Sequence, residues 1–340
     1  MRKILITGGA GFIGSNFVEH LFENYPGYRL LILDALTYAG TLDNFPEKIK
    51  NDSRFSFWQG DITNPEIVNE LVAQVDTVIH FAAETHVARS IFDEKRFFIT
   101  DVIGTQVVAN AVLKNPVDRF VHISSSEVYG TSKMDHMTEE HPLNPTSPYA
   151  SAKSGADRLV YSYYVAYGVP AVIVRPFNNY GPKQHLEKVT PRFITSALLN
   201  ENLVIHGEGS SSRDWLFVKD HCLALDKILH IDVAKVKGEA INIGTGRDLD
   251  IITIARMIRE RVPKSKSQFI FGEDRQGQVM RHNASTEKAF KILGWKAETP
   301  YEEGITKTIE WYQKNETWWK KLLWMRSVPM RMADGKEVYY

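Results

Sequence analysis

The 340-residue chain has only one cysteine, Cys222, which excludes an internal disulfide bond and any metal site built from several cysteines. It lacks an excess of either charge, because 41 Lys and Arg balance 41 Asp and Glu. This balance gives no overall attraction to nucleic acid or to an anionic membrane. The sequence has no uninterrupted apolar run near ~18 residues and no apolar segment of signal-peptide length at its start. We therefore expect a cytoplasmic protein without nucleic-acid or membrane partners.

Metal-ligand patterns are missing as well. The eleven histidines are scattered, and no two of them form an H-x-x-x-H pair with a third acid, so we expect no metal. Apolar residues make up 43% of the chain and charged residues 24%, a balance typical of folded proteins. The length favours one large α/β domain with an attached lobe, or two domains.

Short apolar runs alternate with longer helix-patterned segments over the first 180 residues. Several runs are apolar on both faces, as are strands of a parallel sheet that is covered by helices on each side. The spacing between them leaves room for crossover helices, and so predicts a doubly wound parallel α/β sheet. The runs are Lys3–Thr7, Arg29–Leu33, Phe55–Trp58, Asp76–Phe81, Arg119–Ile123 and Ala171–Val174.

The sequence pattern changes after about Pro176, where Pro, Gly, Ser and Asn are more frequent and the expected strands are shorter. We interpret residues 1–176 as the sheet domain and residues 177–325 as a smaller C-terminal α/β lobe that binds substrate. One run, Glu239–Gly244, lies in a segment near 215–245 that can return to the main sheet. Residues 326–340 are expected to form a tail, which is loose from Arg331 onward.

Three glycines follow the first expected strand with G-x-x-G-x-x-G spacing: Gly8, Gly11 and Gly14. Glycine permits a tight turn and lets the backbone approach a pyrophosphate, while the N-terminus of the next helix stabilises the negative charge. Phe12 and Ile13, at the start of that helix, are also expected to bind the cofactor. A strand before the glycines, a helix after them and an acid about 20 residues later predict a Rossmann dinucleotide site.

That acid, Asp34, ends the second expected strand and selects the dinucleotide. Its carboxylate can accept hydrogen bonds from both ribose hydroxyls but repels a 2′-phosphate, and no Lys or Arg follows in Ala35–Thr37. We therefore expect NAD rather than NADP. Asp61 and Ile62 follow the third strand; Asp61 either accepts from the adenine amino group or caps the next helix.

Tyr149 and Lys153 form a Y-x-x-x-K motif, and Pro148 before them suits the start of a helix. The spacing places both side chains on one helix face, where the ammonium is expected to lower the pKa of Tyr149. A phenolate can take the proton of a sugar hydroxyl while the carbon loses hydride to NAD. Ser124–Ser126 close the fifth strand nearby, and the combination predicts a dehydrogenase-type site.

With these motifs, the chain resembles the extended short-chain dehydrogenase/reductase family of nucleotide-sugar enzymes over about residues 1–320, and within it the dTDP-glucose 4,6-dehydratases. The resemblance implies an NAD-dependent hydro-lyase that converts an NDP-hexose into the NDP-4-keto-6-deoxyhexose. C4 is oxidised, water is eliminated across C5 and C6, and hydride returns to C6. The stretches that carry the resemblance are Leu36–Gly40, Ala82–Val87, Asn178–Pro182, Glu187–Lys188, Arg213–Trp215 and Gly304–Tyr312.

The resemblance implies that Glu127 is the base that removes the hydrogen from C5, with Ser125 and Ser126 beside it, and that Ala82 contacts the cofactor. Arg213 and Arg281 are candidates for the substrate diphosphate, because a guanidinium binds phosphate through two hydrogen bonds. We also expect Asp274–Gly277 to shape the nucleotide pocket. Further substrate-binding residues implied by the resemblance are Thr85, Asn178, Glu187, Lys188 and Asn242.

Three positions depart from the dehydratases. Ser126 stands where they carry the Asp that acts as general acid on the leaving C6 hydroxyl. Either protonated Glu127 delivers that proton itself, or Ser126 relays it through water. Ala88 replaces an Asp, and Asp101 replaces an Asn. The changes at 88 and 126 touch the sugar side of the site.

Three other functions stay open at this point. A nucleotide-sugar 4-epimerase shares the Tyr–Lys–NAD chemistry but needs no base at C5. A UDP-glucuronate decarboxylase shares Ser126 and Glu127 but needs a cation for the substrate carboxylate. A protein that binds NAD without turnover is the third. The resemblance also implies a homodimer that pairs through the segments near 101–114 and 149–167, whose apolar faces suit a helix bundle.

Overall fold

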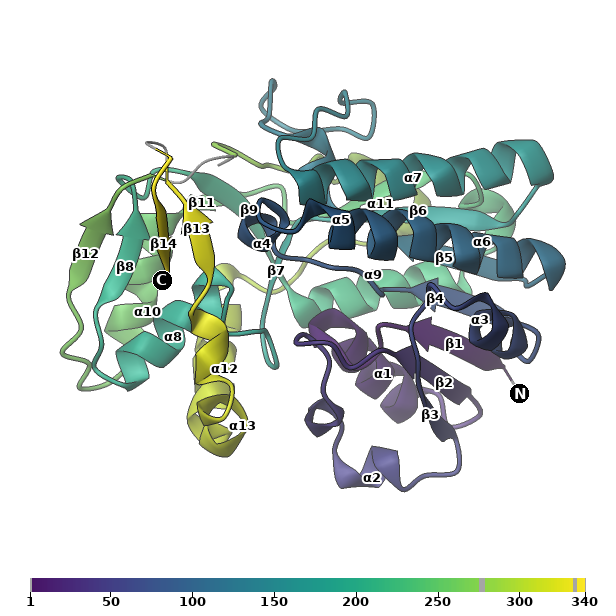
Figure 1. The fold of residues 1–340 in the computed structure, drawn as a ribbon, viewed down its shortest axis with the longest axis horizontal. Coiled ribbons are helices and arrows are strands. Elements are labelled where there is room, and N and C mark those ends of the chain that lie inside the picture. The colour runs from purple at the N-terminus through teal and green to yellow at the C-terminus, as the bar shows by residue number, and fades with distance from the viewer. Residues whose placement is uncertain (1, 275–278, 333–334, 340) are drawn as a thin grey trace.

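The computed structural model describes residues 2–274, 279–332 and 335–339 (Figure 1). Its main sheet is parallel, with the strand order β10-β6-β5-β4-β1-β2-β3, which confirms the predicted doubly wound α/β fold. All of the expected apolar runs form strands. The strands of the sheet are β1 (Lys3–Thr7), β2 (Arg29–Asp34), β3 (Phe55–Gln59), β4 (Thr77–His80), β5 (Arg119–Ile123), β6 (Ala171–Pro176) and β10 (Ala240–Ile243).

Strand β10 comes from the second half of the chain and pairs with β6 in parallel, Ala240 opposite Ile173. It is the run that was expected to return to the sheet. The chain therefore leaves the sheet after β6, builds part of the lobe and comes back. A single cut at residue 176 does not separate the sheet from the lobe.

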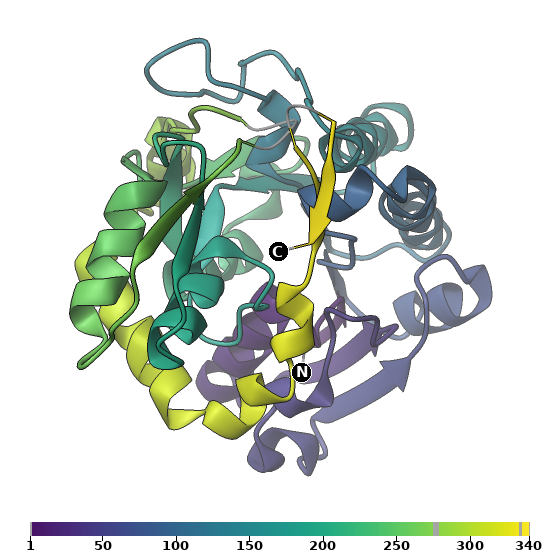
Figure 2. The same ribbon diagram turned by 60° about the vertical axis from the view of Figure 1, so that its left-hand side comes forward.

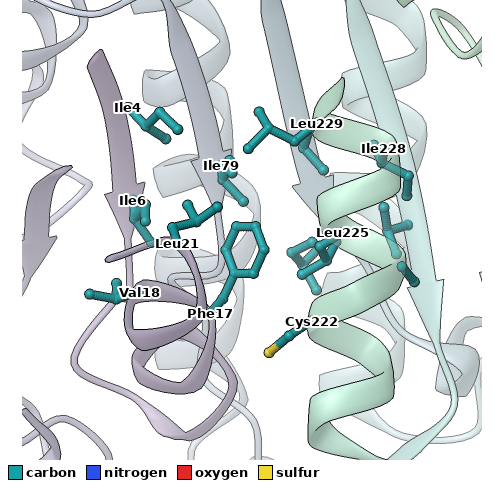
Figure 3. Close-up of a cluster of buried hydrophobic side chains, with 14 of the residues drawn as sticks. Ile4, Ile6, Phe17, Val18, Leu21, Ile79, Cys222, Leu225, Ile228 and Leu229 are labelled. Atoms are coloured by element: carbon teal, nitrogen blue, oxygen red, sulfur yellow. The ribbon is translucent and has the colours of Figure 1, made fainter. Parts of the chain in front are cut away.

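Helices cover both faces of the sheet (Figures 1 and 2). Figure 3 shows one of the two buried layers, where Phe17 from the first helix meets Leu225 beside Ile79 of β4. Cys222 is buried in this layer, and burial raises the pKa of its thiol to about 12. The covering helices are α1 (Phe12–Asn24), α9 (Val218–His230) and α11 (Glu287–Leu293) on one face and α3 (Pro65–Val72), α6 (Thr105–Lys114) and α7 (Pro148–Tyr167) on the other.

One helical stretch, Glu94–Lys114, has the length and mean hydropathy of a candidate membrane span. It comprises α5 (Glu94–Phe97), the π-helical η2 (Phe98–Gly104) and α6. Of its apolar window, 44% is buried inside the protein, and α6 packs against α3 and α7. Because a core helix of a water-soluble protein has the same properties, the stretch is weak evidence for a membrane.

The lobe has its own apolar core, which includes Tyr180, Trp215, Ile254 and Trp319. Its helices are α8 (Val189–Leu198), α10 (Ile251–Arg261), α12 (Tyr301–Lys314) and α13 (Glu316–Lys320). Its strands are β7 (Asn178–Tyr180), β8 (Leu203–His206), β9 (Ser212–Phe217), β11 (Asp248–Asp250) and β12 (Phe269–Gly272). The remaining short elements are η1 (Leu42–Asn44), α2 (Glu47–Lys50), α4 (Val87–Ser90), η3 (Ser126–Tyr129), η4 (Val233–Lys235) and η5 (Leu323–Arg326).

The C-terminal segment is an antiparallel hairpin of β13 (Pro329–Arg331) and β14 (Glu337–Tyr339), drawn in yellow in Figure 2. The expectation of a loose tail is therefore wrong. Val328, Met330 and Met332 are buried and pack against Ala88 of α4. Their alternate spacing, which is that of one face of a strand, was the available signal.

A buried ion pair joins α7 to β6. Asp157 accepts two hydrogen bonds from Arg175, both at 2.9 Å, and a third from the Ser124 hydroxyl at 2.7 Å. Burial raises the pKa of Asp157, but the bonds and charge of Arg175 outweigh it and hold that pKa below its usual value of 3.8. The ionised carboxylate therefore stabilises the fold above pH 4 or so, and this stability is lost as the pH falls through the lower folded pKa.

We expect Asp157→Asn to reduce the free energy of unfolding by about 3–5 kcal/mol at neutral pH, because Arg175 is left buried and unpaired. The difference from wild type should shrink as the pH falls from ~4 through the lower folded pKa, because over this range the unfolded chain binds a proton that the paired carboxylate does not. Urea unfolding at several pH values measures this. The exposed Asp118→Asn is the matched control. An equal loss for both variants, or a loss that does not change with pH, contradicts the prediction.

Candidate active site

A cavity of about 690 Å³ lies where β1, β2, β4 and β5 end, and it continues to the lobe. Ligands of doubly wound sheets bind at these carboxyl ends of the strands. The cavity brings together most of the residues selected from the sequence. Those that line it are Gly8, Gly11, Phe12, Ile13, Gly14, Asp34, Asp61, Ile62, Ala82, Thr85, Ser125, Ser126, Glu127, Tyr149, Lys153, Asn178, Glu187, Lys188 and Arg213.

Two expected substrate-binding residues lie outside the cavity lining. Asn242 is fully buried; its Oδ1 accepts from the Tyr129 hydroxyl at 2.7 Å, and its Nδ2 donates to the Met137 carbonyl at 2.9 Å. Arg281 donates from Nε to Asp248 at 3.0 Å. The expectation for Asn242 is corrected, because its side chain is fully buried and engaged by the protein itself. Arg281 pairs with Asp248 but is 40% exposed, so its role at the diphosphate stays a prediction. In the expected pocket segment Asp274–Gly277, residues 275–277 lie outside the described part of the chain.

The glycine turn fits a dinucleotide pyrophosphate. Gly8 has φ +67°, and a Cβ there would lie 2.5 Å from the backbone N of Ala82. A Cβ on Gly14 would collide with the carbonyl of Gly8. Helix α1 begins directly after Gly11, and no side chain caps its N-terminus. The backbone N–H groups at this end, together with the helix dipole, therefore suit a phosphate group.

Asp34 sits at the end of β2 with little exposure. Its Oδ2 accepts from the backbone N of Ala10 and its Oδ1 from that of Leu36, both at 2.9 Å. Burial raises its pKa, and the two backbone bonds lower it. Each carboxylate oxygen has further lone pairs for ribose hydroxyls.

Asp61 does not cap the next helix. Its Oδ1 accepts from Thr63, and the cap of α3 is Asn64, whose side chain accepts from the backbone N of Glu66. The capping alternative is therefore wrong, and Asp61 faces the cavity. Within residues 2–274, 279–332 and 335–339, no group of three or more His, Cys, Asp or Glu side chains is arranged to hold a metal.

Tyr149 and Lys153 lie on the first turns of α7, which begins with a Ser147 cap and Pro148. The Lys153 Nζ donates to the carbonyl of Ile123 at 2.8 Å, so β5 fixes its position. Burial lowers the pKa of Lys153, whereas the negative charge of Asp101 raises it. Asp101 is itself buried, and desolvation raises its pKa to about 7.

The pKa of Tyr149 is raised, not lowered as expected. Burial is the main cause, the charges of Asp101 and Glu127 add to it, and a hydrogen bond with Ser125 opposes it. The sequence motif places the lysine correctly. It does not reveal that an acid lies close to that lysine or that the phenol is desolvated.

Ser126 and Glu127 begin the short helix η3, and Ser125 caps it by accepting from the backbone N of Glu127 at 3.1 Å. Behind them lies His282, which is fully buried. Its Nδ1 is 3.4 Å from the Ser126 hydroxyl and 3.9 Å from Glu127 Oε1. The sequence analysis missed His282, which is 156 positions away from Ser126 and carries no local motif.

The charged residues Glu187 and Lys188 also line the cavity. Arg89 donates to Glu187 at 2.9 Å, and Lys188 donates to the carbonyl of Thr85 at 2.6 Å. The other oxygen of Glu187 and the Oδ1 of Asn178 are buried without a hydrogen-bond partner. Buried acceptors of this kind are costly unless they are paired, so both are suited to accept from a hydroxylated ligand.

The model of the GDP-mannose 4,6 dehydratase family matches residues 5–308. The chain belongs to this family. The match spans the glycine turn, the Tyr149–Lys153 pair and Glu127, and so includes the residues of the cavity described above.

Relatives of this protein resemble it in sequence over nearly their whole length. The low-salt glycan biosynthesis protein Agl12 of Haloferax volcanii is 43% identical over 310 residues, 91% of this chain and 98% of the relative. A dTDP-glucose 4,6-dehydratase of an Actinoplanes species is 39% identical, over 93% of this chain and 99% of the relative. The crystal structure of a dTDP-glucose 4,6-dehydratase from Streptomyces venezuelae, with NAD bound, superposes with a TM-score of 0.90 at 36% identity, covering 94% and 99% of the chains.

Proposed function

We propose that the protein is an NAD-dependent nucleotide-sugar 4,6-dehydratase, a hydro-lyase that forms an NDP-4-keto-6-deoxyhexose. The main support is that one cavity contains the glycine turn with Asp34, the Tyr149–Lys153 pair and the carboxylate of Glu127. An oxidation at C4 needs the first two, and an elimination across C5 and C6 needs the third. Relatives named dTDP-glucose 4,6-dehydratase support the assignment.

The residues divide the chemistry among them. NAD, held by the glycine turn and Asp34, supplies the acceptor for the hydride of C4 and its return to C6. As a phenolate, Tyr149 takes the proton of the C4 hydroxyl and becomes neutral, and the ammonium of Lys153 stabilises the phenolate that precedes this step. The resulting C4 ketone makes the C5 hydrogen acidic. Glu127 removes that hydrogen as a proton while the hydroxyl leaves C6 as water.

The test is incubation of the wild-type protein with a panel of dTDP-, UDP-, CDP- and GDP-hexoses, followed by mass spectrometry. We expect a product lighter than its substrate by one water. A 4-epimerase product has the same mass as its substrate, and a decarboxylase releases carbon dioxide from a uronic acid sugar. Formation of no dehydrated product from any member of the panel contradicts the proposal.

The choice of NAD over NADP depends on Asp34. We expect Asp34→Asn to weaken NAD binding by about 10–100-fold, because a charge-assisted pair of hydrogen bonds is worth about 1.5–3 kcal/mol. NADP binding should improve relative to NAD, because the repulsion of its 2′-phosphate is removed. Calorimetric titration of both dinucleotides measures the ratio. Equal binding of NAD and NADP by the wild type excludes this role.

A homodimer is the proposed assembly, through the η2–α6 stretch and α7, which contain the segments near 101–114 and 149–167. Exposed apolar side chains lie on both elements, among them Ile103 at 52% and Val165 at 64%. Exposed apolar side chains on neighbouring helices favour association with a second copy. We expect Ile103→Asp with Val165→Asp to convert a dimer into a monomer by sedimentation velocity. A monomeric wild type at micromolar concentration refutes the dimer. The cytoplasmic location stays a prediction.

A further inference from the structure

A buried histidine lies behind the two residues that follow β5. His282 has no exposed surface, and its ring is held from two sides. Its Nε2 lies 2.8 Å from the carbonyl of Gly130, and the ring of Phe177 meets it edge-on with centroids 6.1 Å apart. The other nitrogen, Nδ1, is turned toward Ser126 and Glu127, at 3.4 and 3.9 Å.

These contacts determine the tautomer. A carbonyl oxygen only accepts, so the Nε2 of His282 must carry the hydrogen that is donated to Gly130. In the neutral ring, Nδ1 then has a lone pair and accepts the Ser126 hydroxyl. Burial lowers the pKa of His282 to about 4; the charge of Glu127 and the bond to Gly130 oppose this, while Arg213 and His141 add to it. The resting ring is therefore an acceptor that faces both residues.

The elimination needs a proton at the C6 oxygen, and the His282 ring is placed to transfer one. Glu127 gains a proton from C5, while the oxygen on C6 needs one in order to leave as water. A serine hydroxyl by itself is a weak acid. If Ser126 gives its proton to the C6 oxygen, another group must supply Ser126 with a new proton. Glu127 can be that source, because it has just taken the proton from C5.

We propose that His282 relays the proton from Glu127 to Ser126, so that the Ser126 hydroxyl protonates the departing C6 oxygen. The inference rests on the proposed dehydratase function. The C5–H bond breaks, its electron pair forms the C5–C6 double bond, and the C6–O bond breaks. The proton passes from Glu127 to His282 Nδ1, from Nδ1 to Ser126 Oγ, and from Oγ to the leaving oxygen. Atoms and charge balance, and no further reactant is needed.

The distances suit a relay that tightens on substrate binding. The Ser126 contact of 3.4 Å is long for a hydrogen bond, and the Glu127 contact of 3.9 Å is longer still. Hydrogen bonds of active sites are often long without substrate and shorten in the reacting complex. Because His282 faces Ser126 and Glu127 and lies outside the cavity lining, it acts through these two residues and does not contact the sugar.

The sharpest test replaces His282 by glutamine. The glutamine Nε2 keeps the donor to Gly130, while the acceptor that faces Ser126 and Glu127 is lost. We expect the rate of C4 oxidation in a single turnover to stay within about twofold of wild type, and the elimination to slow by on the order of 10². Deuterium from the solvent should enter C5 of recovered substrate, because Glu127 still removes that hydrogen.

Two matched variants separate a relay from a structural role. His282→Asn places an amide near the position of Nδ1 and loses the bond to Gly130 instead. Ser126→Ala leaves His282 and its anchor in place, and should reproduce the slow elimination even if His282→Gln does not fold. In the double variant Ser126→Ala with His282→Gln, the loss should be no greater than in the worse single variant, because residues that act as one unit are not additive.

Each outcome has one meaning. Elimination at the wild-type rate in His282→Gln overturns the relay, and so does a parallel loss of oxidation and elimination, which indicates a structural role. A wild type that dehydrates no sugar contradicts the proposed function, a separate result. Independent of turnover, the ¹⁵N resonances of His282 should show Nε2 protonated and Nδ1 unprotonated at neutral pH; the reverse tautomer also overturns the relay.

Discussion

Replacing Tyr149 by phenylalanine is expected to reduce the formation of dehydrated product by on the order of 10²–10⁴. The phenol oxygen is the group that takes the proton of the C4 hydroxyl, and every later step needs the C4 ketone. The ring itself is retained, so its edge-on contact with Phe97 stays. The effect should therefore fall on the first chemical step, which single-turnover measurements detect as loss of the reduced-cofactor absorbance.

Tyr163→Phe provides the control for that experiment. Tyr163 lies on the same helix, α7, and its hydroxyl donates to Asn110, away from the cavity lining. Its removal should leave turnover unchanged and affect only stability. If Tyr149→Phe retains wild-type turnover, a different group removes the C4 proton and the assignment of the site is wrong.

Local sequence predicted most of the fold because each strand of the main sheet is a short apolar run of its own. The glycine turn is local too: strand, glycines and helix N-terminus lie within Lys3–Gly14, so their spacing alone predicted the cradle. The same holds for Tyr149 and Lys153, which are one helical turn apart. These elements needed no knowledge of distant contacts.

The predictions that failed, or that the sequence did not offer, concern residues whose contacts lie far away in the sequence. Asn242 is engaged by Tyr129 and Met137, whose positions in the sequence are 113 and 105 residues away. His282 reaches Ser126 because Met137 and Ala284 form a bridge between distant segments. No spacing rule reports such contacts, because they depend on how the lobe returns to the sheet.

Electrostatics was the other limit. The spacing of Tyr149 and Lys153 indicates which charge is near the phenol, but not how far the phenol and the ammonium are removed from water. Desolvation dominates the pKa of both side chains, and Asp101 sits close to the lysine. Burial and the approach of an acid from another helix can be assessed only once the structure places them.

Glu127→Gln is the second change with a large expected effect. The amide has the size of the carboxylate but cannot take a proton, and the backbone N of residue 127 still donates to Ser125. We expect dehydration to fall by on the order of 10²–10⁴ while oxidation at C4 continues. The C4-oxidised sugar should then accumulate, with a steady reduced-cofactor absorbance and no product lighter by one water.

Glu140→Gln is the matched control, because Glu140 is an exposed acid 13 residues further along the chain. It should behave as wild type. If Glu127→Gln keeps most of its turnover, the enzyme has no need of a base at C5, and a 4-epimerase becomes the better reading. The mass of the product separates the two cases, because epimerisation leaves it unchanged.

Glu127→Gln and His282→Gln also test different halves of one proton path. Without the carboxylate, the hydrogen on C5 is never removed, so solvent deuterium should not enter that position. Without the imidazole acceptor, Glu127 still removes the hydrogen, so deuterium should enter while water is lost slowly. The opposite labelling of the two variants follows from their order in the path: the carboxylate acts before the point where exchange occurs, and His282 acts after it.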